Sequence, residues 1–533
     1  MSVIGTAFRR ERVPVPVWAV VAGLLAAATA AAVPQAFGDA SERRTLVELI
    51  TATPSLLAIR GVPDGTDEGA YAFFEVFTYV GLVAGLMSVF LVTRQTRQDE
   101  DLGRTELLLA TPVHRRTPVV VAGWVSGAAN VLLGVLVALG FLAGGLPADG
   151  SALAGTAATC VGLAYTGIAV VVAQVAPTAR ATNAIGVGVV AVTYLLRAAG
   201  DAVGTRSADR LTVVSAWPSW LSPIGWGQHV FPFTRQDLVP LVPCLVVAVV
   251  GVVAALVVGG RRDLGASLLR ERPGRAGGRM RTSLGLAWRL HRTTVIAWAV
   301  GGAVLGAFAG GLGTTAIDTI GDDPSVTKLL ETLVPGGRGA LLDEFVAAVV
   351  GITSILAAAA GIGALNRAAE DDREGRSELL LATPVGRVRR LAEWLGVGVG
   401  AAVLVAVATG AVGGLCFVAT GSGTDRFWST VAAGLAQLPA ALVLVAFAAV
   451  LGVVLPRAAG WLVWVALGLA LVLGQFGGLL RVPDWARQIS PFTHTPGVPA
   501  AHIDWSGAWW LVATAVLLGA VALVLARRQE VSP

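Results

Sequence analysis

Only a few side chains of this 533-residue sequence could take part in catalysis. ATP hydrolysis needs a phosphate-binding loop of the form G-x-x-x-x-G-K-[ST], whose lysine reaches the phosphates. The single lysine, Lys328, follows Thr327, so the sequence contains no Gly-Lys pair and no loop of this kind. We therefore expect no enzymatic activity and no cofactor in this chain, and any ATP that drives it must be hydrolysed by another subunit.

The cysteines and histidines also lack the spacing of a catalytic or metal site. Each cysteine lies within an apolar run, and no CxxC, HExxH or HxxxH pattern is present. We expect no disulfide, no metal site and no catalytic group among these residues, which are Cys160, Cys244, Cys416, His114, His229, His291, His494 and His502.

One eleven-residue segment occurs twice, and the two copies are 272 residues apart. Residues 103–113 read GRTELLLATPV and residues 375–385 read GRSELLLATPV, so only Thr105 and Ser377 differ. The two copies are far more alike than the sequences around them. This contrast indicates that both segments do the same work.

The residues around each copy predict a short acidic and apolar helix, over 99–111 and 371–383. An acid four residues before an arginine forms a favourable helical ion pair, and a proline ends the helix. A glycine inside a helix costs up to about 1 kcal/mol, which indicates that another backbone approaches there. A basic, apolar groove of another protein would suit this helix better than lipid headgroups. The candidate site residues are Asp99, Glu100, Gly103, Arg104, Glu106 and Pro112 in the first copy, and Asp371, Asp372, Gly375, Arg376, Glu378 and Pro384 in the second.

Long apolar runs surround these motifs. The chain is 55% hydrophobic and 14% charged, whereas soluble proteins are about one quarter charged. Because a helix needs about 20 apolar residues to cross a bilayer, the sequence predicts an all-α integral membrane protein with twelve spans. The expected spans cover residues 13–33, 71–93, 118–146, 151–175, 181–199, 238–260, 294–312, 345–365, 391–417, 427–455, 461–479 and 506–526.

Arginine placement predicts the orientation of these spans, because positively charged loops stay in the cytoplasm. Arginines are concentrated before the first span, in residues 261–293 and after the last span, whereas loops 34–70 and 313–344 are acidic. We expect a multi-pass protein of the plasma membrane with both termini in the cytoplasm. The net charge of +5 therefore serves orientation, and we expect no nucleic-acid partner. The abundance of alanine, glycine, valine and arginine is typical of a GC-rich bacterial genome.

Weaker matches keep the same order in both halves, including Trp217-x3-Leu221-Ser222-Pro223 and Trp485-x3-Ile489-Ser490-Pro491. The sequence thus predicts two parallel six-helix repeats related by a pseudo-twofold axis along the membrane normal, with a pathway between them. The expected domains are a first half over 1–265, a cytoplasmic linker with an interfacial helix over 266–293, and a second half over 294–533.

The pattern E-x-x-G-R-x-E-L-L-L-A-T-P-V resembles the coupling-helix motif of type-2 ABC exporter permeases. Over essentially the whole chain, the twelve-span form with two motifs is similar to actinobacterial permeases for polyketide antibiotics or multiple drugs. The resemblance implies that each motif docks into one of two copies of an ATP-binding subunit, which binds ATP and Mg. It also implies interfacial helices over 3–12 and 283–293, and short re-entrant outer helices over 210–232 and 481–500. The implied cargo is an amphiphilic or hydrophobic compound, drug-like or lipid-like, exported from the cell.

Two other classes remain open. A secondary transporter of six-plus-six topology is one, but its usual ionisable group at membrane depth is missing, since Glu75 and Glu393 lie near span ends. A membrane-bound enzyme or scaffold is the other. The polar residues at membrane depth either line a pathway or hydrogen-bond between helices. The candidates for the pathway are Asn130, Tyr165 and Gln437, with Gln174 as a further polar residue of the spans.

Overall fold

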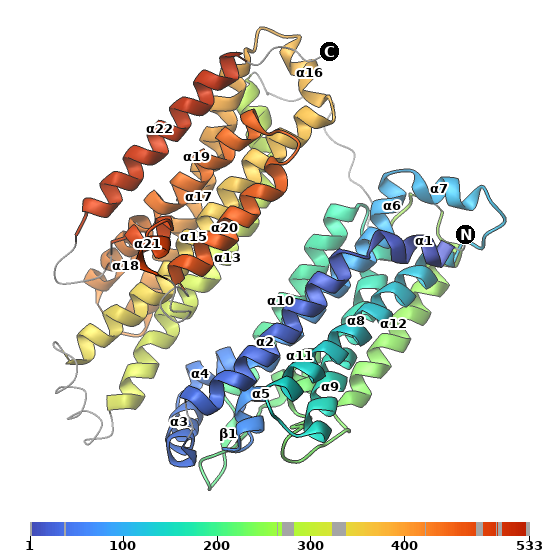
Figure 1. Cartoon of the computed structure of the whole chain (residues 1–533), viewed down its shortest axis with the longest axis vertical. Helices are drawn as coiled ribbons and strands as arrows, with labels where there is room; N and C mark the ends of the chain where they lie inside the picture. Colours follow the sequence, from blue (N-terminus) through green and yellow to red (C-terminus); the bar gives the residue numbers. More distant parts are fainter. Residues whose placement is uncertain are drawn as a thin grey trace. The chain divides into compact units, whose positions relative to one another are not determined.

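The chain forms two compact helical units in the computed structural model, residues 1–274 and residues 275–533 (Figure 1). Each unit is described separately below. The structure describes residues 3–36, 39–263, 265–268, 282–321, 337–421, 423–475, 483–496, 498 and 504–528.

The first unit is an elongated bundle of long helices with short elements at both ends (Figure 1). Its two short strands pair antiparallel, with Thr205 opposite Val214 and Arg206 opposite Val213. The elements are α1 (Val3–Arg10), α2 (Pro14–Ala36), α3 (Ala40–Ala52), α4 (Pro54–Arg60), α5 (Glu68–Gln95), α6 (Arg97–Asp101), α7 (Arg104–Leu109), α8 (Thr117–Ala143), α9 (Ala148–Val175), α10 (Ala179–Ala202), β1 (Thr205–Arg206), β2 (Val213–Val214), η1 (Trp217–Leu221), α11 (Pro223–Gln228) and α12 (Leu241–Arg261).

The second unit is also built from long helices, with α16 at one end (Figure 1). Its described elements are α13 (Ser283–Gly321), α15 (Gly337–Arg373), α16 (Arg376–Leu381), α17 (Arg387–Ala419), α18 (Thr424–Ala436), α19 (Leu438–Val454), α20 (Ala459–Gln475), α21 (Asp484–Arg487), η2 (Pro491–His494) and α22 (Ser506–Arg528).

Eleven helices among the described residues are long and apolar enough to cross a membrane, six in the first unit and five in the second. This confirms an all-α integral membrane protein. The twelfth expected span, over 461–479, begins in α20, which is 17 residues long, and its last residues lie outside the described part of the chain. The count of twelve therefore stays a prediction.

Small residues bring the helices close together in both units. A Cβ atom placed on Gly134 of α8 would lie 2.4 Å from the Gly155 carbonyl oxygen of α9, so only glycine fits there. In the second unit, a Cβ on Gly310 of α13 would lie 2.1 Å from the Gly413 oxygen of α17. Such close backbone contact is typical of helices that pack within a membrane.

Two elements differ from the sequence prediction. We expected a separate interfacial helix over 283–293, but α13 runs without a break from Ser283 through the following span. The span expected over 427–455 is present as Thr424–Val454, but its helix is interrupted at Gln437, which separates α18 from α19. Pro439 lies at the start of α19, where its missing N–H leaves no internal helical bond unmade.

Candidate functional site

Each repeated motif forms a short helix that follows a tight turn at one end of its unit. In the first unit α6 ends at Asp101 and α7 begins at Arg104, while in the second unit α15 ends at Arg373 and α16 begins at Arg376. The single helices predicted over 99–111 and 371–383 are therefore wrong in detail. The two copies of the motif nonetheless fold in the same way.

The turn explains the glycine of each motif. Gly103 and Gly375 both have φ of 69° and lie just before their helix, in the left-handed region that other residues adopt only at a cost. A Cβ atom at either position would meet no other atom within 4 Å. Within the described residues the glycine is explained by its own backbone conformation, and the approach of another backbone, as from a partner protein, stays a prediction.

The arginine of each motif pairs across the turn. Arg104 contacts Asp99 at 3.2 Å, and Arg376 contacts Asp371 at 2.8 Å. The four-residue spacing in the sequence predicts that Arg104 pairs with Glu100, but the break at Gly103 removes the helical geometry that this pair needs. Each bridge joins the residues on the two sides of the turn.

The second acid of each motif has other partners. Glu100 accepts hydrogen bonds from Arg97, at 2.9 Å, and from Arg262 of the segment after α12. Asp372 accepts a hydrogen bond from Arg390 of α17. These contacts fasten the motif to membrane-crossing helices of its own unit, so displacement of the motif would move those helices.

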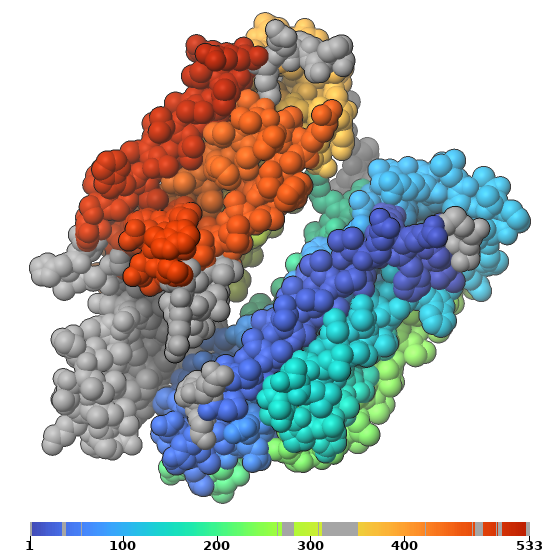
Figure 2. All heavy atoms as spheres, in the orientation of Figure 1, coloured from blue at the N-terminus to red at the C-terminus, as the bar shows by residue number. Residues whose placement is uncertain are grey.

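The outward side of each motif helix carries a leucine and a glutamate. Leu107 is 75% exposed and Leu379 is 80% exposed, and Glu106 and Glu378 are exposed beside them. The prolines that follow, Pro112 and Pro384, are exposed as well. Figure 2 shows the α6–α7 segment projecting from one end of the first unit. Exposed apolar side chains ringed by charge are typical of a protein-binding surface.

The N-terminal helix α1 is attached to the first motif. Arg10 of α1 donates hydrogen bonds of 2.7 and 2.9 Å to the Asp99 carboxylate, which also contacts Arg104. The next residue, Glu11, is 1% exposed and accepts a hydrogen bond of 2.9 Å from Gln95 at the end of α5. Asp99 therefore links α1 to the motif.

The three candidate pathway residues lie inside their units. Asn130 of α8 is 0% exposed and donates hydrogen bonds to Ser88 of α5, at 2.9 Å, and Thr166 of α9, at 3.2 Å. Tyr165 is 0% exposed, with its hydroxyl 2.8 Å from that of Thr193. Gln437 is 5% exposed at the break between α18 and α19. Asn130 and Tyr165 thus hold helices together in this conformation, and their role in a pathway stays a prediction.

Sequence reasoning missed a buried polar network at the opposite end of the first unit. Arg197 and Asp201 of α10 are both 0% exposed and form an ion pair of 3.1 Å. Arg197 also donates to the Ala58 carbonyl at 2.6 Å, while Asp201 accepts from Ser215 at 2.6 Å and from Gln228 at 2.9 Å. The sequence does contain a signal for this ion pair, because an arginine and an aspartate four residues apart on a helix are expected to interact.

His229 extends this network. Its Nδ1 lies 2.6 Å from the Gly225 carbonyl oxygen and its Nε2 lies 3.1 Å from the Ser215 hydroxyl. Burial lowers the pKa of His229 below its ordinary value of 6.5, an effect that the nearby Asp201 carboxylate partly opposes. The network joins α4, α10, α11 and the segment that contains Ser215.

The fold and the site together define an integral membrane protein built from long helices, with an exposed charged motif at one end of each unit. The family model for the C-terminal domain of the multidrug efflux system permease Rv1217c matches residues 280–527. Over 531 residues the chain is 31% identical to the multidrug efflux system permease protein Rv1217c of Mycobacterium tuberculosis (strain ATCC 25618 / H37Rv), covering 98% of this chain and 93% of that protein. The chain therefore belongs to this family of multidrug efflux permeases, which fits a non-enzymatic transport protein.

Proposed function

We propose that this chain is the permease subunit of an ATP-driven ABC exporter. It moves amphiphilic or hydrophobic compounds, drug-like or lipid-like, out of a bacterial cell through the plasma membrane, and both of its termini lie in the cytoplasm. The observation that carries the proposal is the pair of exposed motifs, α7 and α16, with the same turn and the same outward leucine and glutamate. The relative's name supports efflux of several drugs.

Two matching motifs suit two copies of one ATP-binding subunit, which would bind ATP and Mg. The exposed Leu107 and Leu379 would enter apolar depressions on that subunit, and Glu106 and Glu378 would face basic side chains at the rim. Charge complementarity of this kind gives an interface its specificity. This chain supplies the two docking sites and the cargo pathway.

The ion pairs of the first motif provide a route for force. A displacement of α7 would act through Arg104 and Asp99 on Arg10 of α1, and through α6 on α5. In the second unit, Asp372 connects the motif directly to Arg390 of α17. Closure of an ATPase dimer would thereby move helices of each unit, and this movement would open and close the cargo pathway.

The test is to co-express the tagged chain with each candidate ATP-binding subunit of its source organism. We expect one such subunit to co-purify at two copies per chain, measured by native mass spectrometry. ATP hydrolysis should require that subunit, and efflux of a panel of amphiphilic drugs from cells should require both proteins. ATP hydrolysis by this chain alone, or full efflux in cells that lack every candidate subunit, would contradict the proposal. Efflux that stops when the proton gradient is dissipated but ATP is maintained would instead support secondary transport.

A further inference from the structure

One buried arginine, Arg97 of α6, attaches the first motif to two other segments of its unit. Its side chain is 1% exposed. The guanidinium group donates to the Ala173 carbonyl at 2.5 Å and to the Gln174 carbonyl at 3.3 Å, both at the C-terminal end of α9. It also donates to the Ala266 carbonyl at 3.1 Å, in the segment after α12. Three backbone carbonyls from distant parts of the sequence therefore meet at this side chain.

The sequence at the end of α9 explains why a donor is needed there. In a continuing helix the Ala173 carbonyl would accept a hydrogen bond from the N–H group four residues later, but that residue is Pro177, which has none. The last carbonyls of a helix also carry a partial negative charge, which a nearby cation offsets. Arg97 supplies both the missing donor and the positive charge.

The acids of α6 extend this attachment. Glu100 accepts hydrogen bonds from Arg97, at 2.9 Å, and from Arg262, the residue that follows α12. Asp101 accepts a hydrogen bond of 2.8 Å from the backbone N–H of Ala179, the first residue of α10. The helix α6 is thus bonded to the end of α9, the start of α10 and the segment after α12, directly before the turn that leads into α7.

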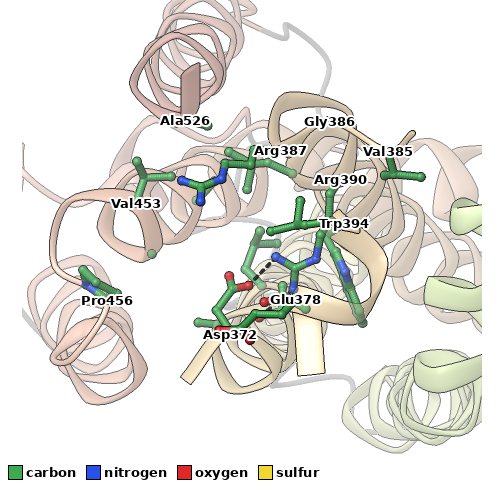
Figure 3. A pocket seen from close by; sticks show the side chains of 18 of the residues that line it. Asp372, Glu378, Val385, Gly386, Arg387, Arg390, Trp394, Val453, Pro456 and Ala526 are labelled. Atoms are coloured by element: carbon green, nitrogen blue, oxygen red, sulfur yellow. Dashed lines mark hydrogen bonds and ion pairs between the residues drawn. The ribbon is translucent and has the colours of Figure 1, made fainter. Parts of the chain in front are cut away.

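The second motif has no arginine at the corresponding position. The shift of 272 residues that relates the motifs places Ala369 there, and a methyl group donates no hydrogen bond. Its other contacts are more exposed. Arg373, an exposed residue, donates to the Pro456 carbonyl at 2.9 Å, and Asp372 pairs with Arg390 of α17 (Figure 3). The second motif is therefore held by fewer buried bonds than the first.

The segment before the first span of each half shows a similar difference. Residues 8–12 read FRRER and align with residues 288–292, which read WRLHR. Leu290 thus stands where the first unit has Arg10, whose guanidinium group bonds to Asp99 of the first motif. Leucine cannot make that bond. The same inequality between the motifs therefore arises at a second, independent position.

Burial makes the attachment of the first motif the stronger one. Hydrogen bonds to charged groups contribute more than those between neutral groups, and loss of one buried partner leaves the other without a counterpart. Exposed ion pairs contribute little. The Glu100 side chain is 11% exposed, whereas that of Asp372 is 48% exposed. We therefore expect the first motif to leave its folded position less often than the second.

We propose that Arg97 is a positioning residue that makes the two docking motifs unequal. This inequality rests on the proposed function, in which α7 and α16 each receive one ATP-binding subunit. A motif that is already held in place loses less conformational freedom when a partner docks, and so it binds more tightly. The ATP-binding subunit therefore occupies the first motif before the second.

The first test needs no partner. Hydrogen exchange of the purified full chain in micelles, corrected for the intrinsic exchange rates, reports the opening of residues 97–110 and of residues 369–382. We expect the first segment to be protected about tenfold more, which corresponds to about 1.4 kcal/mol. Arg97→Lys keeps the charge, but one ammonium group cannot serve all the acceptors of the guanidinium fork. It should lower the protection of the first segment alone.

The matched control is Arg180→Lys, the same substitution at an exposed residue near the start of α10. It should leave the protection of both segments as in the wild type. Equal protection of the two segments in the wild type, or an unchanged first segment in Arg97→Lys, would overturn the proposal.

The second test measures docking at each motif separately by native mass spectrometry. Glu378→Lys leaves the first motif intact, and Glu106→Lys leaves the second. We expect each variant to retain one ATP-binding subunit, with a Kd about tenfold lower in Glu378→Lys. Adding Arg97→Lys should weaken binding in Glu378→Lys but not in Glu106→Lys, whereas general damage to the fold would weaken both.

The outcomes separate the two levels of the proposal. If neither single variant loses a subunit, the docking assignment is wrong and the inequality falls with it. If each loses one subunit but the two affinities are equal, docking stands and the role of Arg97 is refuted. Weakening of both sites by Arg97→Lys would refute that role as well.

Discussion

Glu106 and Glu378 occupy matched, exposed positions on the two motif helices, where an opposing basic surface is proposed. Replacing both with lysine should place like charges against each other across the interface, at a cost of several kcal/mol. We expect the double variant to lose both co-purification of the ATP-binding subunit and drug efflux. Membrane insertion and the thermal stability of the purified chain should be unchanged, since neither side chain is buried.

The control for this charge reversal is Glu42→Lys, an exposed glutamate of α3 at the other end of the first unit. It makes the same change in net charge per site and should leave efflux intact. If the double variant at 106 and 378 still binds the ATP-binding subunit and transports at the native rate, the docking assignment is wrong.

Gly103 and Gly375 are required by their left-handed backbone. Leucine in that conformation costs roughly 1–2 kcal/mol, whereas asparagine tolerates it better. We expect Gly103→Leu with Gly375→Leu to disturb the start of α7 and α16 and to reduce efflux strongly, while the corresponding asparagine variant retains most of it. Equal loss in both variants, measured at equal expression, would show that bulk rather than φ is what matters there.

The residues of the motif were found from the sequence because they occur twice. Their individual roles were not, since the sequence does not show that Gly103 ends one helix before another begins. Because the helix is interrupted there, Arg104 pairs with Asp99. Glu100 instead accepts a hydrogen bond from Arg262, which is 162 residues away in the sequence. Contacts over such a distance have no local signal.

At the scale of helices, Asn130 joins α8 to α5 and α9. Interhelical hydrogen bonds in membrane proteins contribute about 0.6 kcal/mol on average and about 1.7 at most. Asn130→Leu should therefore lower the free energy of unfolding by about 0.6–1.7 kcal/mol, measured by unfolding in mixed micelles. A pathway role adds a second expectation, which is a changed ranking of drugs in the efflux panel without release of the ATP-binding subunit. Unchanged stability and an unchanged ranking would remove Asn130 from both roles.

The buried network around His229 predicts a dependence on pH. The folded state lowers the pKa of His229, so below its ordinary value of 6.5 the unfolded chain takes up a proton that the folded chain does not. The free energy of unfolding of this region is therefore greatest above this pH and decreases as the pH falls below it. The charged groups that face the ring are Asp201, Asp64 and Arg235. The free energy of opening of residues 217–231, measured by hydrogen exchange and corrected for the intrinsic pH dependence of amide exchange, should fall between about pH 7.5 and about pH 5.5. His229→Gln should abolish that difference, and an equal opening free energy in the wild type at both pH values would refute it.

Long apolar runs made most membrane-crossing helices predictable, because a helix satisfies its backbone hydrogen bonds within a single segment in lipid. The predictions that were inaccurate concern where a helix is continuous and where it is interrupted. Nothing in the sequence separates an interfacial helix from the span that follows it, so α13 was divided incorrectly. Conversely, Pro439 marked the helix start after Gln437, but a run of apolar residues on both sides concealed the break.

At the scale of the molecule, the proposed orientation can be tested with single cysteines on a background that lacks Cys160, Cys244 and Cys416. Asp67→Cys is exposed, and a membrane-impermeant maleimide added to intact cells should label it. Leu268→Cys, at a position that is 63% exposed, should be labelled only after the cells are opened. The reverse pattern would place the termini outside, and labelling of both from outside would contradict an even number of spans in the first half.

Among the residues that the structure describes, each unit also has a hydrophobic core whose members all come from that unit. This separation has a consequence for synthesis. At about 5–20 residues per second, the ribosome needs roughly ten seconds to a minute to produce the second unit after the first. The first unit can complete its core during that interval. If the gene is divided within the linker, each of the two fragments should therefore insert into the membrane. The covalent connection then serves mainly to supply the two halves in equal number at the same place in the membrane.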